Sequence, residues 1–250
     1  MTKNLFLLMV LGATAVTAVL ALAPEGNSAT AQQTAGAANA QPVLVELFTS
    51  QGCSSCPPAD KLLARLDTGG GVVALSRPVT YWDRLGWKDT LARPAHDDLQ
   101  RRYAARGLPG GGVFTPEAVV QGTSATVGSD ERALRKLIIS ARGNNPVLLT
   151  QAGGRVTASR AVPSAELRFV AVASNRAVKI GRGENGGRDI GYTNVVLNEA
   201  AVACAPSAVC SAAMPAVIAG QKGADRWAAV LQDKAGGRVQ AVRWIGRPGK

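Results

Sequence analysis

Two pairs of cysteines lie close together in the sequence, and the first has the spacing of a redox site. Cys53 and Cys56 enclose two serines. A thiolate is the nucleophile in disulfide exchange, and the N-terminus of a helix lowers the pKa of a thiol placed there. A helix is expected right after Cys56, because a proline in the first helical turn loses no hydrogen bond. We therefore predict that Cys53 is the exposed attacking residue and that Cys56 resolves the mixed disulfide.

The same motif has other interpretations that the residues leave open. It can be an inert disulfide or half of a metal site. Thiolates suit Cu(I) or Zn, so a non-catalytic metal-binding or interaction module, similar to a metal chaperone, is the alternative function. His96, the single histidine, lies beside two aspartates on a polar segment, where we expect it to be exposed. The residues assign no metal ligands and imply no organic cofactor.

The elements around Cys53 and Cys56 are expected to form a βαβ unit. Residues 43–48 are a short β-prone run that ends in a turn, and the cysteines follow at once. Residues 59–67 have apolar side chains at helical spacing, a glycine run ends that helix, and residues 72–75 resemble the next strand. This order places the cysteines between a buried strand and a helix.

A proline in the middle of the chain strengthens this interpretation. Pro116 directly precedes a β run, where a proline can start a strand but cannot sit within it. In thioredoxin folds a cis-proline beside the CxxC motif shapes the groove that holds the substrate backbone. We therefore predict a cis Thr115–Pro116 bond, with Thr115 and Pro116 binding substrate, and an α/β thioredoxin-like domain over residues 42–145 with an insertion at residues 80–112.

The second half of the chain has a different pattern. Short strand-like runs alternate with Gly-Gly and Ser-Asn turn signals, which predicts an all-β, sandwich-like domain over residues 146–250. Residues 181–186 match GxGxxG, but a strand follows where a dinucleotide site needs a helix, so a glycine-rich hairpin is expected. Cys204 and Cys210 flank a short loop and are predicted to form a structural disulfide.

The N-terminus determines the expected compartment. Residues 1–31 have the charged start, apolar stretch and small-residue cleavage site of a signal peptide, and residues 32–41 resemble a flexible leader. A periplasmic or secreted bacterial protein is predicted, attached to a membrane only if the signal is not cleaved. The net charge of +11 is scattered along the chain, and together with export this disfavours nucleic acid. The expected partners are envelope proteins that bear thiols or disulfides.

Several longer motifs resemble a bacterial family, the secreted thioredoxin-like proteins of domain-of-unknown-function family 1223. The resemblance implies a thioredoxin-like domain followed by a β-rich one, and the family's activity is not established. This chain has Pro78 and Thr80 where members commonly carry His and Asp, so any function of that pair is lost or rebuilt elsewhere. The matching segments are residues 46–60, 81–89, 113–116, 181–185 and 192–196.

Overall fold

The computed structural model describes residues 41–143 and 146–247. The predicted signal peptide lies outside these residues, as does the predicted leader except for its last residue. The expected boundary between two domains, at residues 144–145, also falls outside them. The part described below is the compact unit Ala40–Lys250.

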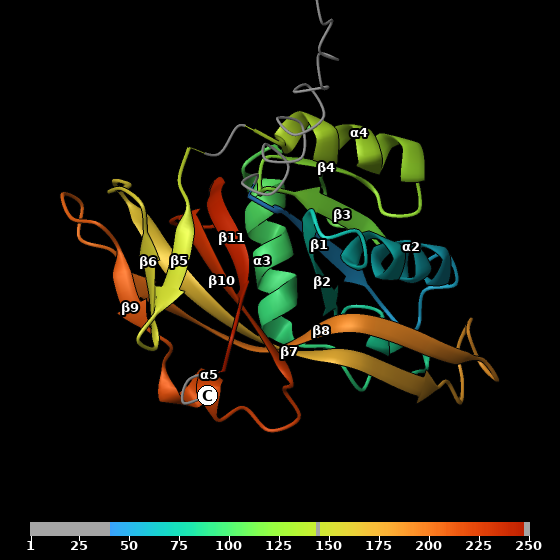
Figure 1. Ribbon diagram of the computed structural model, residues 1–250. Helices are drawn as coiled ribbons and strands as arrows, with labels where there is room; N and C mark the ends of the chain where they lie inside the picture. The colour runs from blue at the N-terminus through green and yellow to red at the C-terminus, as the bar shows by residue number, and fades with distance from the viewer. Residues whose placement is uncertain (1–40, 144–145, 248–250) are drawn as a thin grey trace, which may run out of the picture. The chain divides into compact units, whose positions relative to one another are not determined.

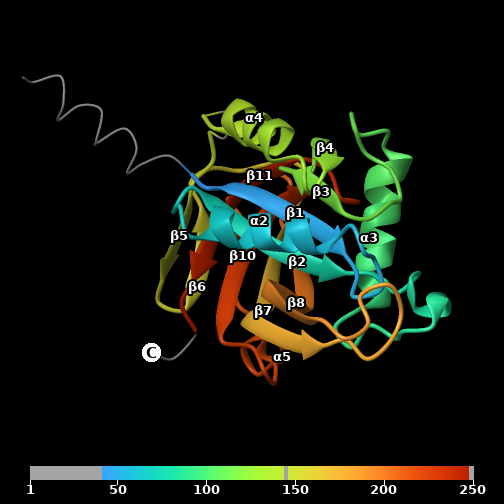
Figure 2. The same ribbon diagram turned by 90° about the vertical axis from the view of Figure 1, so that its right-hand side faces the viewer.

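The first three elements form the βαβ unit that the sequence predicts. Strand β1 (Val43–Thr49) leads into helix α2 (Pro57–Asp67), and strand β2 (Val72–Pro78) pairs with β1 in parallel. Every residue of both strands is buried, as expected for strands covered on both faces. Figure 2 shows α2 in front of these two strands.

Helix α3 follows, and after it come a β-hairpin and another helix. After β2 comes a 3-10 turn at Asp83–Leu85 and then α3 (Pro94–Ala105). Strand β3 (Glu117–Val120) pairs antiparallel with β1, and β4 (Ser124–Val127) pairs antiparallel with β3. Helix α4 (Glu131–Ala141) begins after Asp130, whose carboxylate accepts a hydrogen bond from the backbone N–H of Ala133. An aspartate is among the preferred residues at this position, because its carboxylate satisfies a backbone N–H of the first helical turn.

The remaining elements are mostly strands. Strands β7 (Ala165–Lys179) and β8 (Asp189–Ala203) form a long antiparallel hairpin, joined by the loop of residues 180–188. Antiparallel strands extend the sheet beyond β7, while a separate three-stranded sheet has the order β5-β6-β9. The other elements are β5 (Leu149–Ala152), β6 (Arg155–Ala158), β9 (Ser211–Ala213), α5 (Ala216–Ala219), β10 (Arg226–Asp233) and β11 (Val239–Ile245).

The expected fold class, an α/β thioredoxin-like domain followed by an all-β sandwich, is wrong. The structure is mostly β, with one eight-stranded mixed sheet in the order β11-β10-β7-β8-β2-β1-β3-β4 (Figure 1). The two halves join where β8 runs parallel to β2, with Ser76 opposite Val195. Residues 42–145 and 146–250 therefore contribute to one sheet instead of forming two domains.

The two sides of β1 pack against different helices. Side chains at alternate positions of a strand point to opposite faces. Val43, Val45 and Leu47 pack with apolar residues of α2 and α4, whereas Phe48 packs with Leu99 and other residues of α3. The sheet is thus covered on both faces near the cysteines, which explains why β1 is apolar except for Glu46 and Thr49.

Four charged side chains meet where the halves of the sheet join, and all but the partly exposed Glu199 are buried. Arg77 on β2 contacts Glu46 on β1 at 2.7 Å and Glu199 on β8 at 2.8 Å. Arg168 on β7 lies 2.9 Å from Glu199 and 3.7 Å from Glu46. Burial alone would raise the pKa of Glu199, but Arg168 and Arg77 outweigh it and hold that pKa below its ordinary value. The two acids and two bases therefore neutralise one another across four strands.

Candidate functional site

Cys53 and Cys56 form a disulfide in the turn between β1 and α2. The N–H of Cys53 donates to Ser50 O at 3.2 Å, and the N–H of Cys56 donates to Cys53 O at 3.2 Å. Pro57 and the proline after it occupy the first turn of α2, where their missing N–H groups cost nothing. The predicted position of the cysteines, behind a strand and at a helix start, is confirmed.

Both cysteine side chains are buried, so the expectation that Cys53 is exposed is wrong for this disulfide form. Ser54 and Ser55 between them are exposed. The Sγ of Cys53 lies 3.3 Å from Ser55 Oγ and 3.8 Å from the carbonyl oxygen of Thr115. Because Cys53 has no exposed surface, a partner can reach it only after the groups around it move.

The predicted substrate-binding residues lie beside the disulfide. The Thr115–Pro116 peptide bond is cis, as the sequence predicts. Pro116 is buried and Thr115 is half-buried. The carbonyl oxygen of Pro116 accepts a hydrogen bond from Gly128 N at 2.8 Å, which fixes the start of β3 against the end of β4. The structure therefore brings Cys53 and Thr115, 62 residues apart in the sequence, into contact.

The loop between β7 and β8, residues 180–188, holds the cysteine turn from its other side. Asn185 is buried, and its Nδ2 donates to the carbonyl oxygens of Gln51 at 3.0 Å and Cys53 at 2.8 Å. The Glu184 carboxylate accepts a hydrogen bond from Ser54 N at 2.9 Å. The glycine-rich hairpin itself was predicted, but its contacts with the cysteine turn were not.

The segment after β2 completes the surroundings of the turn. Asp89 accepts a hydrogen bond from Gln51 N at 2.8 Å, and Trp87 Nε1 donates to Gln51 Oε1 at 2.9 Å. The Trp87 ring also lies against the β7–β8 loop, where a Cβ on Gly181 would come within 2.8 Å of it. Figure 2 shows this loop, in orange, beside the segment that follows β2. Two distant segments therefore pack on the cysteine turn and on each other.

A buried carboxyl group lies one helical turn beyond the disulfide. The N–H of Asp60 donates to Cys56 O at 3.1 Å. The side chain of Asp60 is buried, and an interaction with the Thr49 side chain only partly offsets the effect of burial on the pKa of this carboxyl group. Burial raises the pKa of Asp60 from 3.8 to about 8, so this group is mainly protonated at neutral pH. Burial also raises the pKa of Asp89, to about 6.

His96 is buried, which corrects the expectation of an exposed residue. Its Nδ1 lies 2.8 Å from Pro78 O. Burial, with the positive charge of Arg77, lowers the pKa of His96 to about 3, so the ring is neutral. The charged groups that affect it are Arg77, Glu199 and Arg93. Within the described part of the chain, no three His, Cys, Asp or Glu side chains gather in a way that could hold a metal ion.

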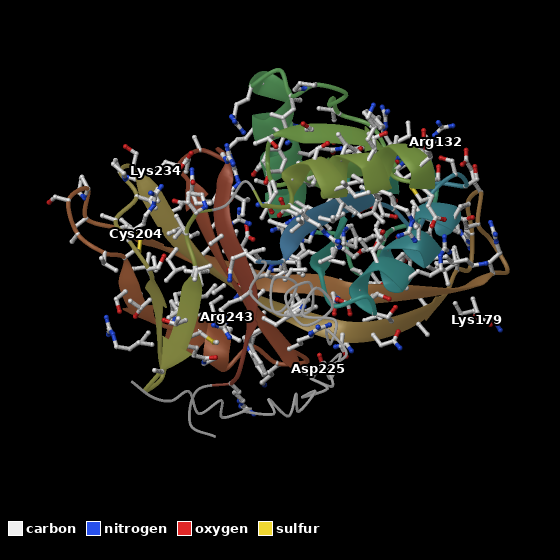
Figure 3. The ribbon with its side chains drawn as sticks, turned by 45° about the horizontal axis from the view of Figure 1, so that its top comes forward. Arg132, Lys179, Cys204, Asp225, Lys234 and Arg243 are labelled. Atoms are coloured by element: carbon white, nitrogen blue, oxygen red, sulfur yellow. A yellow bond between two sulfur atoms is a disulfide. The ribbon has the colours of Figure 1, made fainter. Side chains whose placement is uncertain are left out.

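Cys204 and Cys210 form a second disulfide, as predicted. Cys204 follows the end of β8 and Cys210 precedes β9, so this bond lies at the opposite end of the β7–β8 hairpin from residues 180–188. Figure 3 shows Cys204 far from Lys179, the last residue of β7. Both sulfurs join the core beneath the three-stranded sheet. The bond is placed to stabilise that sheet and lies away from Cys53.

Replacing both Cys204 and Cys210 with serine is expected to lower the free energy of unfolding by about 2 kcal/mol, because the bond closes only a short loop. For a chain of this size the melting temperature should fall by roughly 5 °C. The Cys53–Cys56 disulfide should still form, as alkylation and mass spectrometry would show. An unchanged melting temperature together with a lost Cys53–Cys56 bond would contradict this assignment.

Two features bear on the compartment. The cysteines of each pair lie at disulfide distance, with Cα atoms 5.4 Å and 5.0 Å apart, which is consistent with an extracytoplasmic protein. Among residues 41–143 and 146–247, no helix combines the length and apolar character that a membrane crossing requires.

Comparisons with known proteins identify relatives without an assigned role. The family model described as a protein of unknown function, DUF1223, matches residues 44–232. No curated protein matches the chain. A crystal structure from Agrobacterium tumefaciens resembles it with a TM-score of 0.69 and 27% identity, over 83% of this chain and 95% of that one. HBP35 of Porphyromonas gingivalis, at TM-score 0.50 and 14% identity over 82% of this chain and 75% of its own, shares the fold alone.

Proposed function

This chain belongs to the DUF1223 family of proteins of unknown function, and we propose that it is a thiol–disulfide oxidoreductase of the bacterial periplasm or exterior. One observation carries the proposal: a cysteine pair at the start of α2 has its first sulfur 3.8 Å from the carbonyl oxygen of Thr115. A backbone carbonyl oxygen beside a reactive sulfur can hold an extended peptide as an added strand. Cysteines of envelope proteins are the proposed substrates.

The reduced pair would act in two steps. The Cys53 thiolate attacks one sulfur of a partner disulfide, the partner's S–S bond breaks, and the leaving thiolate takes a proton. The Cys56 thiolate then attacks the Cys53 sulfur, forms the Cys53–Cys56 bond, and releases the second partner thiolate. The partner gains two electrons and this protein loses them. A dithiol reductant returns the pair to its reduced form.

The surroundings of the pair support separate roles for the two sulfurs. The N-terminus of α2 favours a thiolate at Cys53. Cys56 is the N-cap residue of α2, and its carbonyl oxygen accepts a hydrogen bond from the N–H of the buried Asp60. Asp60 holds a proton at neutral pH and therefore adds no negative charge beside Cys56. Access to Cys53 then depends on displacement of the groups that cover it.

The test is catalysis of disulfide exchange by the purified mature protein. Dithiothreitol should reduce insulin faster with the protein present than without it. We expect no acceleration by the Cys53→Ser variant and full acceleration by the Cys204→Ser/Cys210→Ser variant. The second variant is the matched control because it also lacks a disulfide. A rate equal to the uncatalysed background would overturn the proposal. Retention of Zn or Cu(I) by the reduced pair without exchange would overturn it in favour of metal binding.

A further inference from the structure

The hydrogen bond between Glu184 and Ser54 places a carboxylate next to Cys53. Ser54 follows Cys53 directly in the turn before α2, and Glu184 Oε2 accepts a hydrogen bond from Ser54 N at 2.9 Å. Hydrogen bonds from the hydroxyl and the N–H of Ser54 lower the pKa of Glu184, so its carboxylate is charged at neutral pH. An anion from a loop 130 residues away is thus bound to the backbone N–H of the residue next to the proposed nucleophile.

This contact opposes the effect of the helix start on Cys53. A thiolate there is stabilised by free N–H groups and by the positive end of the helix dipole. Glu184 accepts from Ser54 N, which is then unavailable to a thiolate, and adds a negative charge, so each effect disfavours a second anion on Cys53. The other ionisable groups around the turn are Asp60 on α2, Asp89 after β2, and Arg188 on the loop. Asp60 is protonated at neutral pH, and Arg188 donates to Asn185 at 2.7 Å.

Asn185 keeps Glu184 in this position. Its two hydrogen bonds to Gln51 and Cys53 fix the loop against the cysteine turn, and its side chain is completely buried. Glu184 itself is exposed, so replacing it does not disturb the core. Asn185 therefore fixes the loop, and the charge of Glu184 can be removed by substitution without disturbing it.

We propose that Glu184 destabilises the Cys53 thiolate and thereby biases the pair toward its disulfide, so that the reduced protein donates electrons to partner disulfides. A less stable dithiol form corresponds to a more reducing couple. This inference rests on the proposed function, because a direction of electron transfer has meaning only if the pair exchanges. Glu184 acts through the effect of its charge on Cys53 and does not contact the reacting sulfur of the partner.

The experiment compares Glu184→Gln with Glu131→Gln, which removes an exposed carboxylate from α4, remote from the cysteine turn. The pKa of Cys53 is read from alkylation rate against pH in a Cys56→Ser background. We expect Glu184→Gln to raise the alkylation rate below that pKa by about three- to tenfold, since one pKa unit is a factor of ten. In the protein that keeps both Cys53 and Cys56, Glu184→Gln should shift the equilibrium with glutathione toward the dithiol by a similar factor at pH values above that pKa.

Salt provides a readout that a purely structural role would not move. The charge of Glu184 is exposed, so raising the ionic strength to about 1 M should shrink the difference between wild type and Glu184→Gln. If Glu184→Gln matches Glu131→Gln in both titration and equilibrium, the inference is overturned while the proposed function stands. If the titration shifts but the wild type exchanges no disulfide, the proposed function fails and the electron-donor direction fails with it.

Discussion

Replacing Arg77 with methionine is expected to lower the free energy of unfolding by about 3–5 kcal/mol. The Arg77 side chain is fully buried between Glu46 and Glu199, which lie 2.7 Å and 2.8 Å from its nitrogens. Methionine fills much of the same space but carries no charge. Glu46 and Glu199 would then share Arg168 as their cation, and one buried negative charge would lack compensation.

Urea unfolding at neutral pH measures this effect. Arg65→Met is the matched control, because Arg65 pairs with Glu131 at the surface, where both side chains are about half exposed. Its cost should stay below about 1 kcal/mol. Adding Glu199→Gln to Arg77→Met restores a neutral cluster and should recover at least about 1 kcal/mol of the loss. If Arg77→Met and Arg65→Met cost the same, the four charges do not act as a buried unit.

Replacing Asp60 with asparagine is expected to make the stability of the protein less dependent on pH. The pKa of Asp60 is about 8 in the folded protein and near 3.8 in the unfolded chain. Below pH 4 both states are protonated, so the carboxyl costs nothing. As pH rises toward 8 the unfolded chain ionises first and the folded state loses stability, by roughly 1.4 kcal/mol per pH unit. Asparagine does not titrate and avoids this loss.

The measured quantity is the difference in unfolding free energy between Asp60→Asn and wild type at two pH values. We expect it to change by roughly 4 kcal/mol in favour of the variant from pH 4 to pH 7. Asp98→Asn, at an exposed position of α3, should change by only a few tenths of a kcal/mol over the same range. Parallel pH profiles for wild type and Asp60→Asn would show that Asp60 is ionised in the folded state.

Local patterns predicted the surroundings of the disulfide well. The β-prone run, the two prolines and the apolar spacing of α2 act within a few residues of one another, so their outcome does not depend on the rest of the chain. The same holds for the strand that begins after Pro116. These signals give elements in order along the sequence, and they place Cys53 at a helix start.

The continuous sheet was missed because its signal lies in pairing between distant strands. Strand β7 runs from Ala165 to Lys179, although polar residues interrupt its apolar pattern. Glu46 and Arg77 are charges within the mostly apolar strands β1 and β2, and Glu199 is a charge on β8. A buried charge requires a partner. Their complementary signs in both halves of the chain were the sequence signal that the halves share one sheet.

The groups that hold the cysteine turn were missed for a related reason. Asn185 and Glu184 lie in a glycine-rich loop, and nothing in the spacing of that loop indicates which surface it meets. The amide of Asn185 has its two donor bonds to backbone carbonyls of residues 51 and 53, which leave no trace in side-chain type. The burial of Cys53 follows from such contacts and could not be predicted from the motif alone.

The contact between Asn185 and Cys53 sets an order of events when the chain is made. Cys53 and Cys56 are synthesised first, and Asn185 follows 132 residues after Cys53. Contacts of such long range form slowly, because a large loop must close before they contribute. During that interval the two thiols are open to small oxidants and to foldases without the cover seen in the finished protein. Oxidation of this pair can therefore precede the closing of its own site, and the β7–β8 hairpin then encloses a bond that already exists.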